Sequence, residues 1–407
     1  YKEATDTEPL YTWESSKDEP LRISDYITME AGHTYYVREL YDVPGYYLNE
    51  SAVPVNVPTN FEDDMVLTFD FYNTPIEWNI KKTDMNDNLL TTSPNGSFFT
   101  LEVYDTQETL DDTSDDGTPI ATLCTNDATY KSKGYFDMEE YIKQGLVRGG
   151  HHYRIHEAGA ADGYRLTSDI TVEINPAGTT NTIITSVQDD EIRIRLRKAD
   201  EKGNVLTTVK TIDGEQGFVL TIYDEDTGEE VFTIDTSDEE YQKNGYVDVS
   251  KYLSSSKNYV VKETAQPIGY YKAKDVSFTV DSFSADNSVL KLEEVESNGK
   301  KLQVGVITMI DPKINAEFRK ENNVGDVIFE SNGEGFEFQI FDTKGTDDIS
   351  DDEVVGVINT MEMPHNEAGY IEIGQFLQEA TKYRIHESYV PSGYAYSQED
   401  AYITTPG

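Results

Sequence analysis

Apolar and polar residues alternate with a period of two along most of this chain, which is the pattern of half-buried β-strands. The stretches 78–82, 194–198 and 316–320 are clear examples, since each alternates apolar with polar residues and ends on a lysine. Short stretches such as 138–144 fit only one or two helical turns. Together with many Tyr, Thr and Val residues, the pattern predicts an all-β chain.

One block of sequence recurs four times. Each copy reads Tyr-x-hydrophobic-x-Glu, and a Gly-Tyr pair begins six residues after the Glu. The copies are Tyr35–Glu39 with Gly45, Tyr153–Glu157 with Gly163, Tyr259–Glu263 with Gly269, and Tyr383–Glu387 with Gly393. The glutamates lie 106 to 124 residues apart, which is the length of a domain and too long for a solenoid unit. We interpret the Gly-Tyr pair as a turn followed by a core tyrosine.

Two further blocks keep step with the first and indicate the domain boundaries. A Phe-x-hydrophobic-x-hydrophobic-aromatic-Asp block recurs at 99–105, 218–224 and 336–342, and a lysine-ended opening strand precedes each copy. The predicted domains are 1–74, which lacks its opening strands, 75–190 and 191–312, which are complete, and 313–407, which lacks its closing strand. Short junctions with proline and without Gly/Ser linkers predict an elongated, fairly stiff rod. We therefore interpret the chain as an internal piece of a longer protein, with the missing strands about 30–40 residues beyond each end.

Three kinds of polar residue fall on the core-facing side of the predicted strands. A lysine ends the apolar set of each opening strand, and a glutamate ends that of each Tyr-x-hydrophobic-x-Glu strand. An Asn or Asp lies nine residues before each lysine, at the end of the preceding closing strand. They are Lys82, Lys198 and Lys320; Glu39, Glu157, Glu263 and Glu387; and Asn73, Asp189 and Asp311. Because burying an isolated charge is costly, the amines should be neutral or paired and the glutamates should have raised pKa values.

This pattern resembles the Cna B-type, or SpaA-like, prealbumin-like repeat domains of Gram-positive surface adhesins and pilins. The resemblance covers nearly the whole chain and is carried by Lys-x-Asp on the opening strand, by the Phe block, and by Tyr-x-hydrophobic-x-Glu with its Gly-Tyr. It implies tandem Ig-like/prealbumin-like β-sandwich domains. It also implies that the lysine amine of each complete domain condenses with the Asx side chain, assisted by the catalytic glutamate, to form an intramolecular isopeptide bond.

Carried onto this sequence, the resemblance implies two complete sets of three residues and two incomplete ones. The complete sets are Lys82, Glu157 and Asp189, and Lys198, Glu263 and Asp311; the incomplete sets are Glu39 with Asn73, and Lys320 with Glu387. Both complete sets use Asp where the family often has Asn, so condensation would release water instead of ammonia. The same sets could instead be buried, hydrogen-bonded ion pairs without covalent closure.

The amino-acid composition disfavours several kinds of partner and binding site. The chain carries 77 Asp and Glu against 33 Lys and Arg, and the net charge of −44 disfavours nucleic acid and anionic membrane surfaces as partners. No stretch is long and apolar enough for membrane insertion. The single cysteine, Cys124, excludes a disulfide framework, and no cofactor or metal site is predicted. We interpret the acidic runs 111–116 and 347–352 as solvated hairpin tips in preference to calcium sites.

The preferred interpretation is a structural stalk segment of a bacterial surface adhesin or pilus-like protein, which is not an enzyme and only cross-links itself once. The resemblance implies an extracellular place on the bacterial cell surface, cell-wall anchoring through a region outside this chain, and neighbouring repeats as partners. The alternative is an adhesin module, with a host extracellular protein or a glycan as its partner. A glycoside hydrolase with paired carboxylates is disfavoured because four active sites in a row would be unusual. A halophilic origin would explain the charge but not the polar sets.

Overall fold

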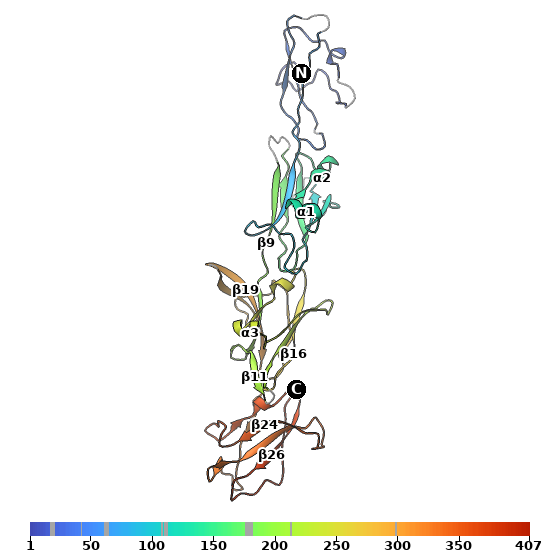
Figure 1. Ribbon diagram of the computed structural model, residues 1–407. Helices are drawn as coiled ribbons and strands as arrows, with labels where there is room; N and C mark the ends of the chain where they lie inside the picture. Colours follow the sequence, from blue (N-terminus) through green and yellow to red (C-terminus); the bar gives the residue numbers. More distant parts are fainter. Residues whose placement is uncertain are drawn as a thin grey trace. The chain divides into compact units, whose positions relative to one another are not determined.

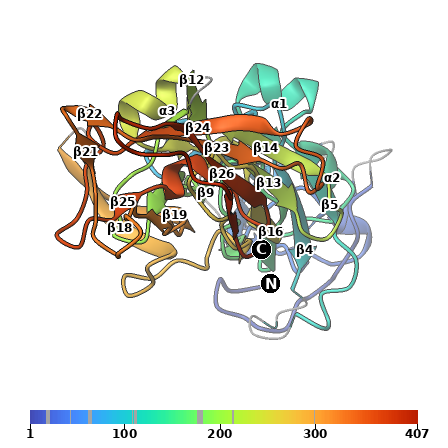
Figure 2. The same cartoon turned by 90° about the horizontal axis from the view of Figure 1, so that it is seen from below.

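Most of the regular secondary structure in the described residues is β-strand (Figure 1, Figure 2). The computed structural model describes residues 1–16, 21–41, 43–60, 65–106, 109, 113–175, 182–211, 214–297 and 299–407. By its contacts the chain separates into two compact units, Tyr1–Ala161 with Leu166–Asp190, and Asp162–Arg165 with Glu191–Gly407. The predicted all-β class and the tandem β-sandwich architecture are confirmed, whereas the rod-like arrangement stays a prediction.

Helices are few and short in the described part of the chain. They are α1 (Ala128–Lys133), α2 (Glu139–Lys143) and α3 (Glu239–Asn244), with 3-10 turns η1 (Ile23–Asp25), η2 (Ser250–Tyr252) and η3 (Gly374–Phe376). The expected helical turns at 138–144 correspond to α2. Within the described residues, none of the helices has the length and apolar character needed to cross a lipid bilayer.

Residues 75–190 form a β-sandwich inside the first unit. One sheet has the order β6-β3-β9, and the other has the order β5-β4-β7-β8. Their strands are β3 (Trp78–Asp84), β4 (Thr100–Asp105), β5 (Ala121–Cys124), β6 (Phe136–Asp137), β7 (His152–Gly159), β8 (Ile170–Glu173) and β9 (Ile183–Asp189). Core side chains from both sheets, among them Ile80 and Val103, are fully buried in one apolar cluster.

Residues 191–312 repeat this sandwich in the second unit. The two sheets have the orders β15-β10-β19-β18 and β14-β13-β16-β17, and β11 and β12 form a separate hairpin. The strands are β10 (Ile194–Asp200), β11 (Thr208–Thr211), β12 (Gly214–Gly217), β13 (Val219–Asp224), β14 (Glu230–Asp235), β15 (Val247–Asp248), β16 (Tyr259–Ala265), β17 (Val276–Phe278), β18 (Leu290–Ser297) and β19 (Lys300–Asp311).

The first and last strands of each complete sandwich lie side by side and run parallel. Strand β3 pairs with β9, and β10 pairs with β19, each over seven residue pairs. Because these strands are far apart in sequence and adjacent in space, a bond between them would close nearly the whole domain.

In the described residues, neither outer region has the parallel pair of first and last strands. Residues 313–407 contribute β20 (Glu317–Phe318), β21 (Glu330–Ser331), β22 (Glu334–Gly335), β23 (Glu337–Asp342), β24 (Glu353–Asn359), β25 (Ile371–Glu372), β26 (Lys382–Tyr389) and β27 (Ala401–Thr404). Four of them form the sheet β24-β23-β26-β27, while β20 pairs only with β25. Residues 1–74 contribute the hairpin of β1 (Thr34–Val37) and β2 (Val53–Asn56).

The expected closing strand before Asn73 does not form. Residues 65–74 carry no strand assignment, and Leu67, which strand alternation would place on the same face as Asn73, is 39% exposed. The physical reason is that a closing strand pairs with an opening strand in each complete domain, and the described residues of 1–74 provide no such partner. Phe69 and Phe71 are nevertheless less exposed than Asp70 and Tyr72, the residues that follow them, so the predicted alternation is present in part.

Candidate functional site

Strand register brings the lysine and aspartate of each complete set to one face of the sheet. Lys82 pairs with Val187 across the parallel ladder, and Asp189 lies two residues further along β9. Residues two apart on a strand share a face, so Asp189 points to the same side as Lys82. In the second sandwich, Lys198 pairs with Met309 and Asp311 lies two residues beyond it.

In residues 75–190 the three predicted side chains meet in the core. The Nζ atom of Lys82 contacts Oδ1 of Asp189 and lies 2.6 Å from Oε1 of Glu157. Lys82 and Asp189 are completely buried, and Glu157 is 3% exposed. The side chains come from β3, β7 and β9, so the set joins the two sheets of the sandwich.

Residues 191–312 hold the second complete set in the same arrangement. The Nζ atom of Lys198 contacts Oδ1 of Asp311 and lies 2.9 Å from Oε1 of Glu263. All three residues have no exposed surface. Among the described residues, Oδ2 of Asp311, like Oδ2 of Asp189, is buried and makes no hydrogen bond within normal geometry. Each aspartate therefore directs Oδ1 at the amine.

Each glutamate is oriented by a backbone N–H ten residues further along the chain. Its Oε2 atom accepts a hydrogen bond from Asn49, Thr167, Ala273 or Ser397, in chain order, at 2.7, 2.8, 2.7 and 2.7 Å. In the three repeats that contain the lysine, the Oε1 atom of the glutamate is directed at the lysine amine. This backbone hydrogen bond was not predicted from the sequence. Its constant spacing, ten residues after each glutamate, is the one signal in the repeats that could have indicated it.

An aromatic ring and a tyrosine hydroxyl also position each buried lysine. The first residue of the Phe block lies against the amine, with Phe99 5.2 Å from Lys82 and Phe218 5.1 Å from Lys198. The backbone N–H of Lys82 donates to the hydroxyl of Tyr130 on α1, and that of Lys198 donates to Tyr241 on α3. These contacts hold the backbone and the amine of each lysine in one place.

Burial changes the protonation of the aspartates. It raises the pKa of Asp189 to about 7 and that of Asp311 to about 8; the lysine ammonium opposes the shift, and the neighbouring glutamate adds to it. The sequence pattern did not predict a raised pKa for the aspartates. Near neutral pH these aspartates are thus partly in the uncharged acid form, which is the form that an amine can attack.

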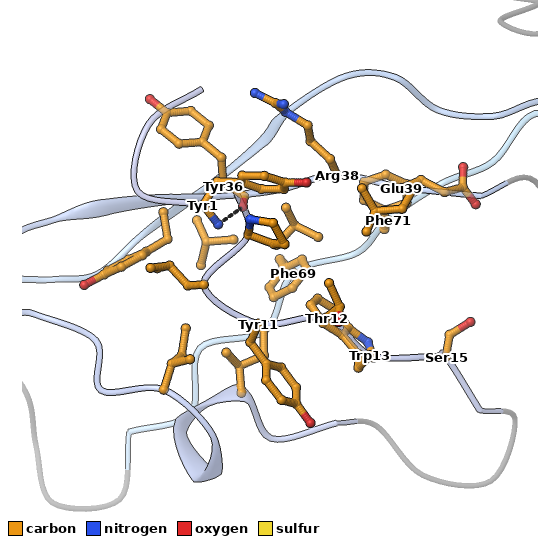
Figure 3. Close-up of a pocket in the computed structure, with 18 of the residues that line it drawn as sticks. Tyr1, Tyr11, Thr12, Trp13, Ser15, Tyr36, Arg38, Glu39, Phe69 and Phe71 are labelled. Atoms are coloured by element: carbon orange, nitrogen blue, oxygen red, sulfur yellow. Dashed lines mark hydrogen bonds between the residues drawn. The ribbon is translucent and has the colours of Figure 1, made fainter. Parts of the chain in front are cut away.

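The incomplete sets contain the pairs that their sequences allow. The Nζ atom of Lys320 lies 2.8 Å from Oε1 of Glu387. Asn73 donates from Nδ2 to Oε1 of Glu39 at 2.5 Å. An apolar cavity of about 940 Å³ adjoins the second pair, with Phe69 and Phe71 in its wall and Trp13 opposite them (Figure 3). In both cases the glutamate has one of its two expected partners.

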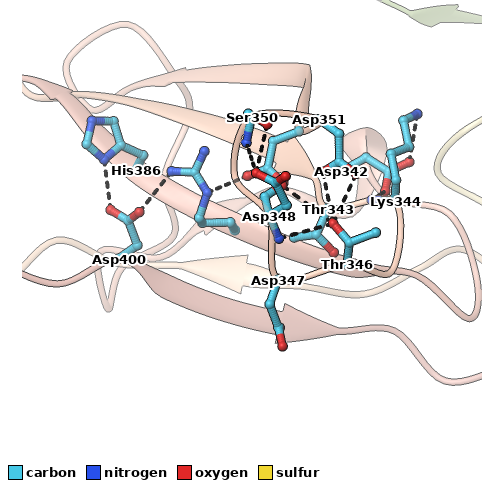
Figure 4. Close-up of polar contacts among 12 residues, drawn as sticks. Asp342, Thr343, Lys344, Thr346, Asp347, Asp348, Ser350, Asp351, His386 and Asp400 are labelled. Atoms are coloured by element: carbon cyan, nitrogen blue, oxygen red, sulfur yellow. Dashed lines mark hydrogen bonds and ion pairs between the residues drawn. The ribbon is translucent and has the colours of Figure 1, made fainter.

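The acidic runs are only partly solvated tips. Asp347, Asp348 and Asp351 are exposed, as expected (Figure 4). Asp352, in contrast, accepts a hydrogen bond from Arg384 Nε at 2.5 Å, and its side chain is 2% exposed. In residues 75–190, Asp116 likewise accepts from Arg154 at 2.7 Å; Asp111 and Asp112 lie outside the described residues. The tip interpretation is therefore wrong for the last aspartate of each run, because a buried guanidinium from β7 or β26 pairs with it.

We expect removal of metal ions with EDTA to change the melting temperature by less than about 2 °C. The buried carboxylates of Asp116 and Asp352 are already neutralised by arginine, so they do not need a cation. Differential scanning calorimetry with EDTA, and with calcium restored, measures this. A drop of about 5 °C or more that calcium reverses would show instead that the acidic loops hold a structural calcium ion.

Comparison with known proteins finds matches among solved structures. A scan against protein-family models finds no match, and a search of curated proteins finds none either. Among solved structures, the Bacillus anthracis TIE protein is 18% identical with a TM-score of 0.26, and the match covers 82% of this chain and 50% of that one. A streptococcal ancillary pilin is 16% identical with a TM-score of 0.28, covering 70% and 76%. The shaft pilin SpaA of Lactobacillus rhamnosus GG is 15% identical with a TM-score of 0.23, covering 58% and 97%.

This chain thus spans half the length of the TIE protein. The two pilins belong to the class that the repeated motifs resemble.

Proposed function

We propose that the chain is a stalk segment of a bacterial surface adhesin or pilus, in which Lys82–Asp189 and Lys198–Asp311 isopeptide bonds close the two complete domains. The observation that carries this proposal is the repeated contact of a buried lysine with an aspartate and a glutamate, between the first and last strands of each sandwich. An extracellular, cell-wall-anchored location belongs to the same proposal and is in keeping with the pilins that the chain is similar to.

The chemistry follows from the protonation of the set. The neutral Nζ atom of the lysine attacks the Cγ carbon of the protonated aspartate, and a tetrahedral intermediate forms. The glutamate takes a proton from the nitrogen and delivers it to the departing hydroxyl, so one C–N bond forms, one C–O bond breaks and one water leaves. The folded strands hold the reacting atoms in contact, which replaces a high reactant concentration. The event occurs once per domain, so the chain is not a turning-over enzyme.

The bond would strengthen the domain along its length. Lys82 and Asp189 are 107 residues apart in sequence, and Lys198 and Asp311 are 113 apart. By analogy with disulfides, cross-linking a loop of this size stabilises the folded state by about 4–5 kcal/mol in the chain-entropy model. More important for a stalk, the bond joins the first strand to the last, so that tension bypasses the hydrogen-bonded ladders. Intact mass tests the proposal, because each bond removes one water.

Bond formation is expected to slow as the pH falls below about 7. The reacting state is an uncharged amine beside an uncharged aspartic acid, and it holds the same number of protons as the ammonium–carboxylate pair. The pKa of Asp189 is raised to about 7 and that of Asp311 to about 8, so below these values a further proton binds and the amine is left as an ammonium, which is not a nucleophile. Cell-free synthesis at pH 5 to 9, followed by mass spectrometry at timed intervals, measures the rates. A rate that keeps increasing as the pH is lowered to 5 would contradict this reacting state.

An adhesin module that binds a host protein or a glycan is the second candidate. The observation that favours it is the apolar cavity in residues 1–74, where Tyr11 and Trp13 provide aromatic surface (Figure 3). Trp13→Ala should then abolish binding of the chain to a glycan or host-protein array and leave the mass deficit unchanged. Absence of binding by the unaltered chain would leave the stalk as the better proposal.

A further inference from the structure

The Gly-Tyr turn of residues 191–312 contacts the next domain, and the cross-link chemistry makes no use of it. The N–H of Ile314 donates to the carbonyl of Gly269 at 2.9 Å, and the N–H of Tyr271 donates to the carbonyl of Pro312 at 2.9 Å. From the other side, the N–H of Gly269 donates to the carbonyl of Leu377, just after η3, at 2.7 Å. The turn therefore holds both the connecting peptide and the short helix of residues 313–407.

The earlier turns repeat these contacts inside their own units. The N–H of Ile76 donates to Gly45 at 2.9 Å in the first unit, and the N–H of Ile192 donates to Gly163 at 2.8 Å in the second. Gly163 also donates to the carbonyl of Leu253, just after η2, at 2.7 Å, as Gly269 does to Leu377. In all three turns the N–H of an isoleucine near the start of an opening strand donates to the glycine carbonyl. At Gly163 and Gly269 the glycine N–H also donates to the residue after a short helix.

The residue after each Gly-Tyr pair reaches into the next domain. Tyr47 is 3% exposed and belongs to the core cluster of residues 75–190, and Tyr271 packs against the core of residues 313–407. Arg165 takes this position in the second turn, where it donates to the carbonyl of Val280 at 2.9 Å. The tyrosine of the pair itself is 42% exposed at Tyr46, so the expected core tyrosine is wrong there: the following residue is the one inserted.

The fourth turn lacks these contacts in the described part of the chain. A Cβ atom added at Gly269 would lie 3.3 Å from the Cα of Gln375, whereas one added at Gly393 would meet nothing within 4 Å. The residue after the fourth pair is Ala395, where the other turns have Tyr or Arg. The backbone is otherwise the same, since φ is +97° at Gly269 and +99° at Gly393.

We propose that the Gly-Tyr-x turn is a docking surface by which one domain holds the next, and that its partner is a domain of the same fold. The partner is engaged through the first residues of its opening strand and through its short helix. Hydrogen bonds between these two elements and one glycine restrict rotation of the connecting peptide. The large residue that follows the Gly-Tyr pair adds apolar or ionic contact. This docking would stiffen the joint between domains whether or not the domains are covalently closed.

Cleavage by trypsin after Lys313 tests the proposal on the full chain. Lys313 is exposed and lies in the connecting peptide that the Gly269 turn holds, so cutting there requires the joint to open. We expect Gly269→Val to raise the rate of this cut by about tenfold or more, because its side chain would displace the backbone of η3. Gly393→Val is the matched control, since it imposes the same backbone strain without the contact, and should leave the rate unchanged. Equal rates in the two variants would overturn the proposal.

A second variant covers the case in which Gly269→Val unfolds residues 313–407. Unfolding would appear as cleavage at many sites, including Lys344, and not only after Lys313. Tyr271→Ala avoids backbone strain and gives the turn the Gly-Tyr-Ala sequence of the fourth copy. Selective acceleration of the Lys313 cut in this variant, with the melting temperature of the domains retained, supports docking. An unchanged rate in Tyr271→Ala would overturn it.

Discussion

The intact chain is expected to weigh two waters less than its sequence, one for each complete domain. In both sets the amine already contacts the carboxyl it would attack, no residue of the set has more than 3% of its surface exposed, and the aspartate is shifted toward its acid form. Electrospray mass spectrometry of the denatured protein measures the deficit. Proteolysis should also release a branched peptide that joins the segment around Lys82 to the segment around Asp189.

Single substitutions separate the two bonds. Lys198→Ala and Glu263→Ala should each reduce the deficit to one water, since the first removes the nucleophile and the second removes the group that moves the proton. Lys320→Ala is a matched control, because Lys320 pairs with Glu387 but contacts no aspartate or asparagine among its described ion pairs. It should leave the deficit at two waters. A wild-type mass equal to that of the sequence would reduce both sets to buried ion pairs.

Under mechanical tension, the two complete domains are expected to stay folded in the wild-type chain and to open in variants that cannot close. In Glu157→Gln the 107 residues between Lys82 and Asp189 become extensible, so the chain should lengthen by roughly 350 Å in one step, at about 3.3–3.6 Å per residue. The wild-type domain should show no such step, because the force would pass through the covalent bond. Single-molecule force spectroscopy on the chain held at its two ends makes the measurement.

The controls for this experiment come from the same chain. Glu263→Gln should add a similar step for the 113 residues between Lys198 and Asp311, and the double variant should show both. Lys320→Ala should add no step, since residues 313–407 have no complete set to lose. A wild-type trace with the same two steps as the double variant would contradict covalent closure.

Much of this site was predictable from sequence because it follows from a strand's period of two. Trp78, Ile80 and Lys82 were expected on one face, and all three are buried there. The same alternation placed Glu157 and Glu263 in the core, and the repeats identified which lysine, glutamate and aspartate belong to one domain. These are local patterns, and a strand turns alternate side chains to the core wherever it lies.

Other features of the site depend on residues that meet only after folding. The anchor of Glu263 on the N–H of Ala273, the ring of Phe218 beside Lys198, and the pairing of Arg384 with Asp352 involve turns, loops and neighbouring strands. The predicted closing strand before Asn73 does not form for the same reason. Alternation predicts which side chains share a face, but a β-strand also needs a neighbouring strand with which to form hydrogen bonds.

The sequence by itself determined that the chain is a series of β-domains and which polar side chains of the complete sets face the core. Only the tertiary structure decided that β3 lies parallel to β9 in the register that brings Lys82 to Asp189. It also decided that the aspartate carries a raised pKa, and that the turn at Gly269 holds the next domain. The physical reason is that period and spacing are set by neighbours along the chain. Strand register, desolvation of the polar sets and contacts between domains are set by groups that are distant in sequence, in some cases by more than a hundred residues.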